Sequence, residues 1–174
     1  TLGLVGFGAI AQAVARRAAG FGMKVLYWNR SARDDAAAAL GATRCADLDE
    51  LLGQADFVSL HLPLTAETGA LIDAARLAAM KPGAVLINTA RGAVVDETAL
   101  IEALQSGHLA AVGLDVFAAE PTVPVALLAM EQVILTPHIG SATAACRTDM
   151  AMRALNNLLT FLGGGTPPDR LPAP

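Results

Sequence analysis

The stretch LGLVGFGAIA, residues 2–11, decides the fold. Leu2–Gly6 is an apolar run with the length of a buried strand, and Ala9–Ala19 has the composition of a helix. Between them stand the small residues of a G-x-G-x-x-A pattern. A strand that turns into a helix through this pattern is the setting of the dinucleotide-binding fingerprint, although small residues also occur at turns of purely structural importance.

Each small residue of the pattern has a separate reason to be small. Gly6 permits a tight turn, Gly8 allows the backbone to approach a pyrophosphate, and Ala11 allows the helix to pack closely on the sheet. The free N–H groups at the helix start, around Ala9 and Ile10, can then bind the phosphates. We therefore predict a dinucleotide site here.

Short apolar segments alternate with helical segments along the rest of the chain. Further strands are expected at 23–28, 43–45, 57–60, 84–88, 111–114 and 133–135, and further helices at 33–40, 47–52, 73–80, 96–105 and 142–161. Asp47 and Asp73 can cap the second and third of these helices. This alternation predicts an α/β fold, a Rossmann-type, doubly wound parallel sheet with helices on both faces. We expect a single dinucleotide-binding domain over 1–162, followed by a Pro/Gly-rich tail over 163–174.

Composition limits the function classes. The chain has 174 residues, is 54% hydrophobic and has a formal net charge of −4, which argues for a sizeable core and against a general nucleic-acid binder. No apolar run approaches the length of a membrane span. Cys45 and Cys146 match no metal-ligand spacing, so we expect no metal and a reducing, cytoplasmic compartment. Because the chain opens inside an apolar run without Met, we expect a fragment that begins at its first strand.

The segment after the second strand bears on the choice of dinucleotide. The fingerprint expects an acidic residue about 20 positions on, to hold the ribose 2′-hydroxyl. Asn29 stands at this point, 23 residues after Gly6 (29 − 6). Arg30 and Arg33 can pair with a 2′-phosphate, and Ser31 can donate to it. The segment therefore favours NADP over NAD, unless it is a solvated turn with incidental arginines.

Three later stretches place polar residues directly after strands. NTARGAVVDETAL contains Arg91, GLDVFAAEP contains Asp115 and Glu120, and LTPHIGSAT contains His138. In an open parallel sheet, ligands bind outside the carboxyl ends of the strands. All three stretches should therefore reach the edge at which the glycine loop lies.

The residue types at this edge point to carbonyl reduction. Arg91 can bind a carboxylate through its planar fork. His138 is suited to general acid catalysis near neutral pH, and Glu120 can stabilise its imidazolium form and fix its tautomer. Each residue alone is more often a surface charge or a structural residue, but together they predict a catalytic group.

The order of G-x-G-x-x-A, HLPLTAETGALI, NTARG, LDVFAAEP and PHIGSAT resembles the cofactor-binding domain of the D-isomer-specific 2-hydroxyacid dehydrogenases, over nearly the whole chain. The resemblance implies that Arg91 binds the substrate carboxylate and carbonyl, that His138 donates the proton and that Glu120 is its partner. Together with the patterns above it gives a cofactor-binding set: Gly6, Gly8, Ala9, Ile10, Asn29, Arg30, Ser31, Arg33, Leu62, Pro63, Thr68, Thr89, Ala90, Arg91, Asp115, His138, Gly140 and Ser141.

The Asn29-Arg30-Ser31 run is similar to that of the NADP-using glyoxylate and hydroxypyruvate reductases. The resemblance thus implies reduction of a small 2-keto acid to the D-2-hydroxy acid and the reverse oxidation, with NADP preferred and NAD possible, in a homodimer. Two alternatives stay open: a dinucleotide-sensing, corepressor-like regulator, which keeps the same Arg, Glu and His, and an NAD-dependent phosphoglycerate-type dehydrogenase, which Asn29 disfavours.

The chain departs from the family pattern in two ways. Ala11 replaces the third glycine of the fingerprint. The family also carries a substrate domain built mainly from residues before this one, and we expect that domain to be largely absent here. The tail after Gly165 is interpreted as the chain returning toward it.

Overall fold

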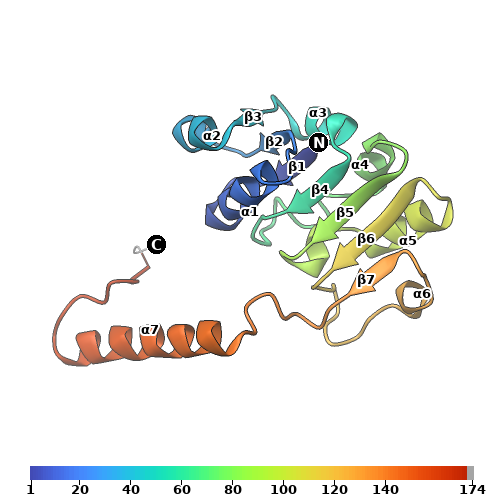
Figure 1. Ribbon diagram of the computed structural model, residues 1–174. Helices are drawn as coiled ribbons and strands as arrows, with labels where there is room; N and C mark the ends of the chain where they lie inside the picture. The colour runs from blue at the N-terminus through green and yellow to red at the C-terminus, as the bar shows by residue number, and fades with distance from the viewer. Residues whose placement is uncertain (172–174) are drawn as a thin grey trace. The chain divides into compact units, whose positions relative to one another are not determined.

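The computed structural model describes residues 1–171. The chain divides into two compact units, Thr1–His138 and a second unit that begins at Ile139. In the first unit, seven parallel strands form one sheet in the order β3-β2-β1-β4-β5-β6-β7 (Figure 1). Because β1 has β2 on one side and β4 on the other, the sheet is wound in two directions from its centre. The predicted doubly wound, Rossmann-type sheet is confirmed.

The strands are β1 (Leu2–Val5), β2 (Val25–Trp28), β3 (Ala42–Arg44), β4 (Phe57–Leu60), β5 (Ala84–Asn88), β6 (Leu109–Leu114) and β7 (Val133–Leu135). The helices of the first unit are α1 (Ala9–Ala19), α2 (Asp34–Leu40), α3 (Leu48–Gln54), α4 (Ala74–Ala79), α5 (Glu97–Gln105) and α6 (Val125–Leu128), with a 3-10 turn over Gly92–Val94. The sequence did not predict α6 or the 3-10 turn, because elements this short show little periodicity.

The central strands send alternate side chains to two hydrophobic cores. Leu2 and Leu4 of β1 belong to a core that contains residues of α1 and α2, whereas Val5 belongs to a core that contains residues of α3, α4 and α5. The alanines of α1 that face the sheet are buried, which allows the close packing that the sequence predicted. Helices therefore cover both faces around β1, and this fixes the position of the loop between β1 and α1.

Aspartate side chains fix the starts of three helices. Asp47, Asp73 and Asp96 each accept hydrogen bonds from backbone N–H groups in the first turn of α3, α4 and α5, respectively. These bonds satisfy donors that have no partner within the helix. The predicted caps at Asp47 and Asp73 are confirmed.

The second unit consists of α7 (Ala144–Leu162) and the segment after it. Asp169 pairs with Arg153 and also bonds to Asn157, so this segment folds back along the helix. The predicted domain limit at 162 lies beyond the boundary between the two units, and the domain limits of the whole protein stay a prediction. Residues 172–174 of the predicted tail lie outside the described residues.

The first prediction concerns His61, which follows β4. Burial lowers the pKa of its imidazole to about 4, from an ordinary value of 6.5. Between these two pH values the unfolded chain binds more protons than the folded chain, so the unfolding free energy should fall as the pH is lowered through this window, by up to about 1.4 kcal/mol per pH unit. Denaturant titrations from pH 7 to 4.5 should show this slope.

The variant His61→Gln should flatten the slope, because glutamine does not titrate but can still bond to the Ser59 hydroxyl, which lies 3.0 Å from Nε2 of His61. His108 and His138 remain in both proteins as internal controls. An equal slope in parent and variant would show that His61 is not its source.

Candidate active site

All the loops that carry predicted site residues leave the sheet at one edge. The glycine loop follows β1, Asn29 follows β2, Leu62 lies in the connection after β4, and Thr89 and Asp115 follow β5 and β6. His138 lies three residues beyond β7. Since all seven strands are parallel, their carboxyl ends share this edge. The site residues of the first unit therefore lie along one edge of the sheet, as predicted.

The structure explains why position 6 of the loop must be glycine, whereas position 8 has room for a side chain. Gly6 has φ +92°, and a Cβ there would lie 2.6 Å from the carbonyl oxygen of His61, so the fold itself demands glycine. Gly8 has an ordinary φ of −79°, and a Cβ there would meet no protein atom within 4 Å. Nothing in the described part of the chain, residues 1–171, requires glycine at position 8. The open space above it fits a ligand that approaches the backbone.

The start of α1 is suited to an anion. The helix has 11 residues and no acidic residue in its first turn. Ala9 and Ile10 are exposed, with Ile10 at 70% of its full exposure. The unpaired N–H groups and the positive end of the helix dipole attract phosphate. The residues present therefore fit the pyrophosphate of a dinucleotide.

Asn29 connects the glycine loop to the segment after β2. Its Oδ1 accepts a hydrogen bond from the backbone N–H of Phe7 at 3.1 Å, and its Nδ2 donates to the carbonyl oxygen of Ser31 at 2.8 Å. An acidic side chain at this position would retain the first bond and lose the second, because a carboxylate has no donor. The amide therefore holds the turn that presents Arg30 and Ser31.

Arg30, Ser31 and Arg33 are all exposed at this turn. The pKa of Glu67 is lowered, first by a hydrogen bond from the Thr65 hydroxyl and to a smaller degree by the positive charge of Arg30. The positive charge of Arg30 therefore acts on a carboxylate in the loop after β4. In that loop the Thr68 hydroxyl donates to the carbonyl oxygen of Pro63 at 2.7 Å.

Leu62, at the start of the same loop, reaches the glycine loop. A Cβ placed on Gly6 would lie 2.9 Å from Cδ2 of Leu62. The predicted residues Leu62, Pro63 and Thr68 therefore come together beside the glycine loop, although their contacts with a cofactor stay a prediction.

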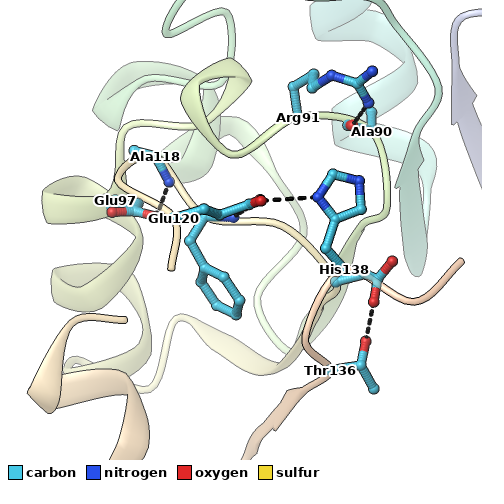
Figure 2. A network of polar contacts seen from close by, with 9 residues as sticks. Ala90, Arg91, Glu97, Ala118, Glu120, Thr136 and His138 are labelled. Carbon is cyan, nitrogen blue, oxygen red and sulfur yellow. Dashed lines mark hydrogen bonds and ion pairs between the residues drawn. The ribbon is translucent and has the colours of Figure 1, made fainter. Parts of the chain in front are cut away.

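Glu120 and His138 form a pair at the same edge (Figure 2). Oε2 of Glu120 lies 2.8 Å from Nδ1 of His138. His138 has φ +53°, which is uncommon for a residue other than glycine, and its N–H donates to the carbonyl oxygen of Thr136 at 3.0 Å. This tight turn holds the His138 side chain, which is 50% exposed.

The Glu120 carboxylate is held from several directions. Its second oxygen, Oε1, accepts from the backbone N–H of Phe117 at 3.0 Å. The pKa of Glu120 is lowered, mainly by the hydrogen bond with His138, then by the Phe117 N–H and, to a smaller degree, by the positive charges of His138 and Arg91. The carboxylate therefore stays ionised beside the imidazole.

Arg91 lies on the neighbouring loop (Figure 2). It is exposed, and its Nη1 donates to the carbonyl oxygen of Ala90 at 2.6 Å. The loop itself is held by Asn88, a buried residue at the end of β5. Its Oδ1 accepts from the Ala90 N–H at 3.0 Å, and its Nδ2 donates to the Arg91 carbonyl oxygen at 3.0 Å. The predicted catalytic residues Arg91, Glu120 and His138 are thus brought together.

Sequence reasoning missed Asn88 and Thr136, and it gave Asp115 a different partner. Asp115 is buried, and its carboxylate accepts a hydrogen bond from the Thr136 hydroxyl, while its backbone N–H donates to the Asn88 carbonyl oxygen. These contacts join the ends of β5, β6 and β7. The available signal for Asn88 and Thr136 was that each is a polar residue at the end of an apolar strand. The predicted cofactor contacts of Asp115 and of the exposed Thr89 stay predictions.

A cavity of about 260 Å³ adjoins the pair. Its walls are mostly apolar and come from the β6–α6 loop, α6 and the end of β7: Phe117, Glu120, Pro121, Val123, Leu128, Leu135, Thr136, Pro137 and His138. Among residues 1–171, no three His, Cys, Asp or Glu side chains are grouped as metal ligands. Gly140 and Ser141 belong to the second unit, and their cofactor contacts stay a prediction.

Comparison with known proteins agrees with this geometry. The model of the D-isomer specific 2-hydroxyacid dehydrogenase NAD binding domain matches residues 1–140. The chain is 50% identical over 169 residues to a glyoxylate reductase of Thermococcus litoralis, covering 97% of this chain and 51% of that protein. It is 52% identical over 166 residues to glyoxylate/hydroxypyruvate reductase B of Pectobacterium atrosepticum, covering 94% and 52%.

A solved structure shows the same fold. The NADPH-dependent glyoxylate/hydroxypyruvate reductase of Sinorhizobium meliloti superposes with a TM-score of 0.89 at 39% identity, covering 95% of this chain and 51% of that one. The chain spans about half the length of the curated relatives it matches. Among the described residues, we find no helix with the length and apolar character needed to span a membrane.

A prediction about stability follows from the close approach of two loops of the site. A Cβ on Gly92 would lie 1.9 Å from the carbonyl carbon of Phe117, so Gly92→Ala must displace backbone. We expect it to lower the unfolding free energy by about 1–3 kcal/mol, the usual cost of overpacking. Gly113→Ala is the matched control, because a Cβ there meets no atom within 4 Å. The urea midpoints of the two variants, compared at an unchanged dependence of the unfolding free energy on urea, measure the two stabilities. Equal stability of the two variants would contradict the close approach.

Proposed function

Because this chain belongs to the D-isomer specific 2-hydroxyacid dehydrogenase family, we propose that it is the cofactor-binding half of a reductase of small 2-keto acids. The substrate class is that of glyoxylate and hydroxypyruvate, which are converted to D-2-hydroxy acids, and the reaction is reversible. The observation that carries the proposal is the Glu120–His138 pair, which lies at the same sheet edge as Arg91 and the glycine loop.

His138 is the proposed proton donor to the keto oxygen. Since Glu120 accepts at Nδ1, the proton to be transferred sits on Nε2, the other ring nitrogen. The ionised carboxylate stabilises the imidazolium and fixes the orientation of the ring. The nicotinamide, when bound, supplies the hydride for the keto carbon. His138 returns to the neutral form after each reduction and is protonated again from solvent, to which its side chain is half exposed.

Arg91 is the proposed anchor of the substrate. Its guanidinium offers a planar fork of donors that matches a carboxylate. The Asn88 amide bonds on either side of it support this role by fixing the backbone from which it projects. A 2-keto acid held by its carboxylate would keep its carbonyl within reach of both Arg91 and His138, and proximity of this kind lowers the barrier.

We propose that NADP(H) is preferred and that NAD(H) is also accepted. The supporting observations are a neutral Asn29 where an acidic residue would repel a 2′-phosphate, and exposed Arg30, Ser31 and Arg33 on the turn that Asn29 holds. The NADPH-dependent relative from Sinorhizobium meliloti is consistent with this preference.

We also propose a homodimer in the cytoplasm. The dimer rests on the resemblance to the family. The location agrees with Cys45 and Cys146, both of which are free thiols.

The proposed 2′-phosphate site predicts a selective effect of Arg30→Ala. Loss of one charge-assisted contact should weaken NADPH binding by about tenfold or more and leave NADH binding nearly unchanged. Calorimetry with both cofactors, at low and high salt, measures this. Arg16→Ala is the matched control, since it removes the same charge from the exposed last turn of α1. Equal losses for NADPH and NADH would rule out the 2′-phosphate role.

The proposed chemistry predicts the effects of changing the pair in the full-length protein. His138→Ala should slow ketoacid reduction by about 10²–10⁴-fold, with NADPH affinity little changed. Glu120→Gln should move the fall in rate to lower pH, because reduction needs the protonated imidazole and the imidazolium loses its negative partner. Steady-state rates from pH 5 to 9 measure both effects.

His108→Gln serves as the control for loss of an imidazole, since His108 bonds to the Leu77 carbonyl oxygen, away from the pair. A pH profile that Glu120→Gln leaves unchanged would remove Glu120 from the mechanism. A full-length parent that binds NADPH without turning over any small 2-keto acid would support the corepressor-like alternative.

A further inference from the structure

The first turn of α5 is bonded to the loop that carries Glu120. Oε1 of Glu97, the first residue of the helix, accepts a hydrogen bond from the backbone N–H of Ala118 at 2.8 Å (Figure 2). Ala118 lies two residues before Glu120. The bond therefore joins segments that are 21 residues apart in the sequence.

The same loop is pressed against the segment that carries Arg91. At Gly92 there is no room for a side chain, because a Cβ would lie 2.2 Å from the Phe117 carbonyl oxygen and 2.3 Å from the Ala118 nitrogen. The Arg91–Glu97 segment thus meets residues 117–118 at both of its ends. Gly92 limits how close the two segments come, and Glu97 holds them together.

The position of the loop sets the direction of the Glu120 carboxylate. Oε1 of Glu120 accepts from the Phe117 N–H at 3.0 Å, and this leaves Oε2 for Nδ1 of His138. Phe117 is buried, whereas Ala118, Ala119 and Glu120 are exposed. Two carboxylates accept hydrogen bonds from the backbone N–H groups of this loop: Glu120 from Phe117, and Glu97 from Ala118. The bond to Glu97 is the one that ties the exposed end of the loop to another element.

We propose that Glu97 is a positioning residue, which holds the Phe117–Glu120 loop so that the Glu120 carboxylate meets His138. The proposal deepens the proposed function and rests on it for its catalytic meaning. Glu97 acts by accepting a hydrogen bond from Ala118. Its negative charge is not what the loop requires.

The chain offers a substitution series that separates the bond from the charge. Glu97→Gln retains a side-chain oxygen that can accept from the Ala118 N–H, whereas Glu97→Ala removes it. Both variants lose the negative charge and its favourable interaction with the helix start. Glu102→Ala, an exposed glutamate of the same helix, controls for loss of a carboxylate from α5.

The test is the titration of His138 by NMR in this 174-residue chain. The chain has three histidines, and His138→Asn identifies the resonance. Glu120→Gln, which removes the charged partner, should lower the midpoint by about 0.2–0.7 pH unit, as for an exposed ion pair. Glu97→Ala should reproduce most of this shift, while Glu97→Gln and Glu102→Ala should leave the midpoint unchanged. Arg91, the other charged group that acts on Glu120, is kept in every variant.

Two outcomes would overturn the proposal: an unchanged midpoint in Glu97→Ala, or equal shifts in Glu97→Ala and Glu97→Gln. If Glu97→Ala does not fold, Glu97→Asp takes its place, because its carboxylate is one methylene short of Ala118 and should give the same shift. The titration needs no turnover. A midpoint that shifts as expected, together with a full-length protein that reduces no small 2-keto acid, would keep the positioning role and reject the proposed function.

Discussion

Parallel alignment of seven strands is the constraint on which the site depends. Every strand that is followed by a loop at its carboxyl end delivers that loop to the same edge, and the register across β1, β4, β5 and β6 brings Val5, Leu60, Asn88 and Leu114 level with one another. The next residues along each strand are therefore neighbours in space although they are far apart in sequence. A glycine loop, an arginine and an acid–histidine pair could be read separately in the sequence because each follows an apolar strand.

The strands and caps were predictable because their signals are local. The predicted bounds of β5 and β7 agree with the structure, and the aspartates expected to cap α3 and α4 do so. The network behind the site was not predictable. The bonds of Glu97 to Ala118 and of Thr136 to Asp115 each join residues that are 21 positions apart. No sequence pattern indicates which polar groups will pair over such a separation. Only the packed sheet decides these partners.

Asn29 shows how one residue can serve the fold and the proposed specificity together. A residue at this position must accept from the Phe7 N–H, because that bond holds the glycine loop against the end of β2. An aspartate would do so equally well. The additional bond from Nδ2 to the Ser31 carbonyl oxygen requires an amide and shapes the turn that carries Arg30. The neutral side chain at position 29 and the shape of the turn that carries Arg30 are thus two consequences of the same residue.

The contacts around Glu120 keep one member of the Glu120–His138 pair ionised. The pKa of Glu120 lies below the ordinary value of a carboxyl group because the hydrogen bond with His138, the Phe117 N–H and the charge of Arg91 all favour its ionised form. The ionised carboxylate therefore offers His138 a negative partner at Nδ1. In the proposed reduction, proton transfer from Nε2 then requires no second proton movement at Nδ1. The backbone bonds that hold the carboxylate in place therefore support His138 in its proposed role as the acid.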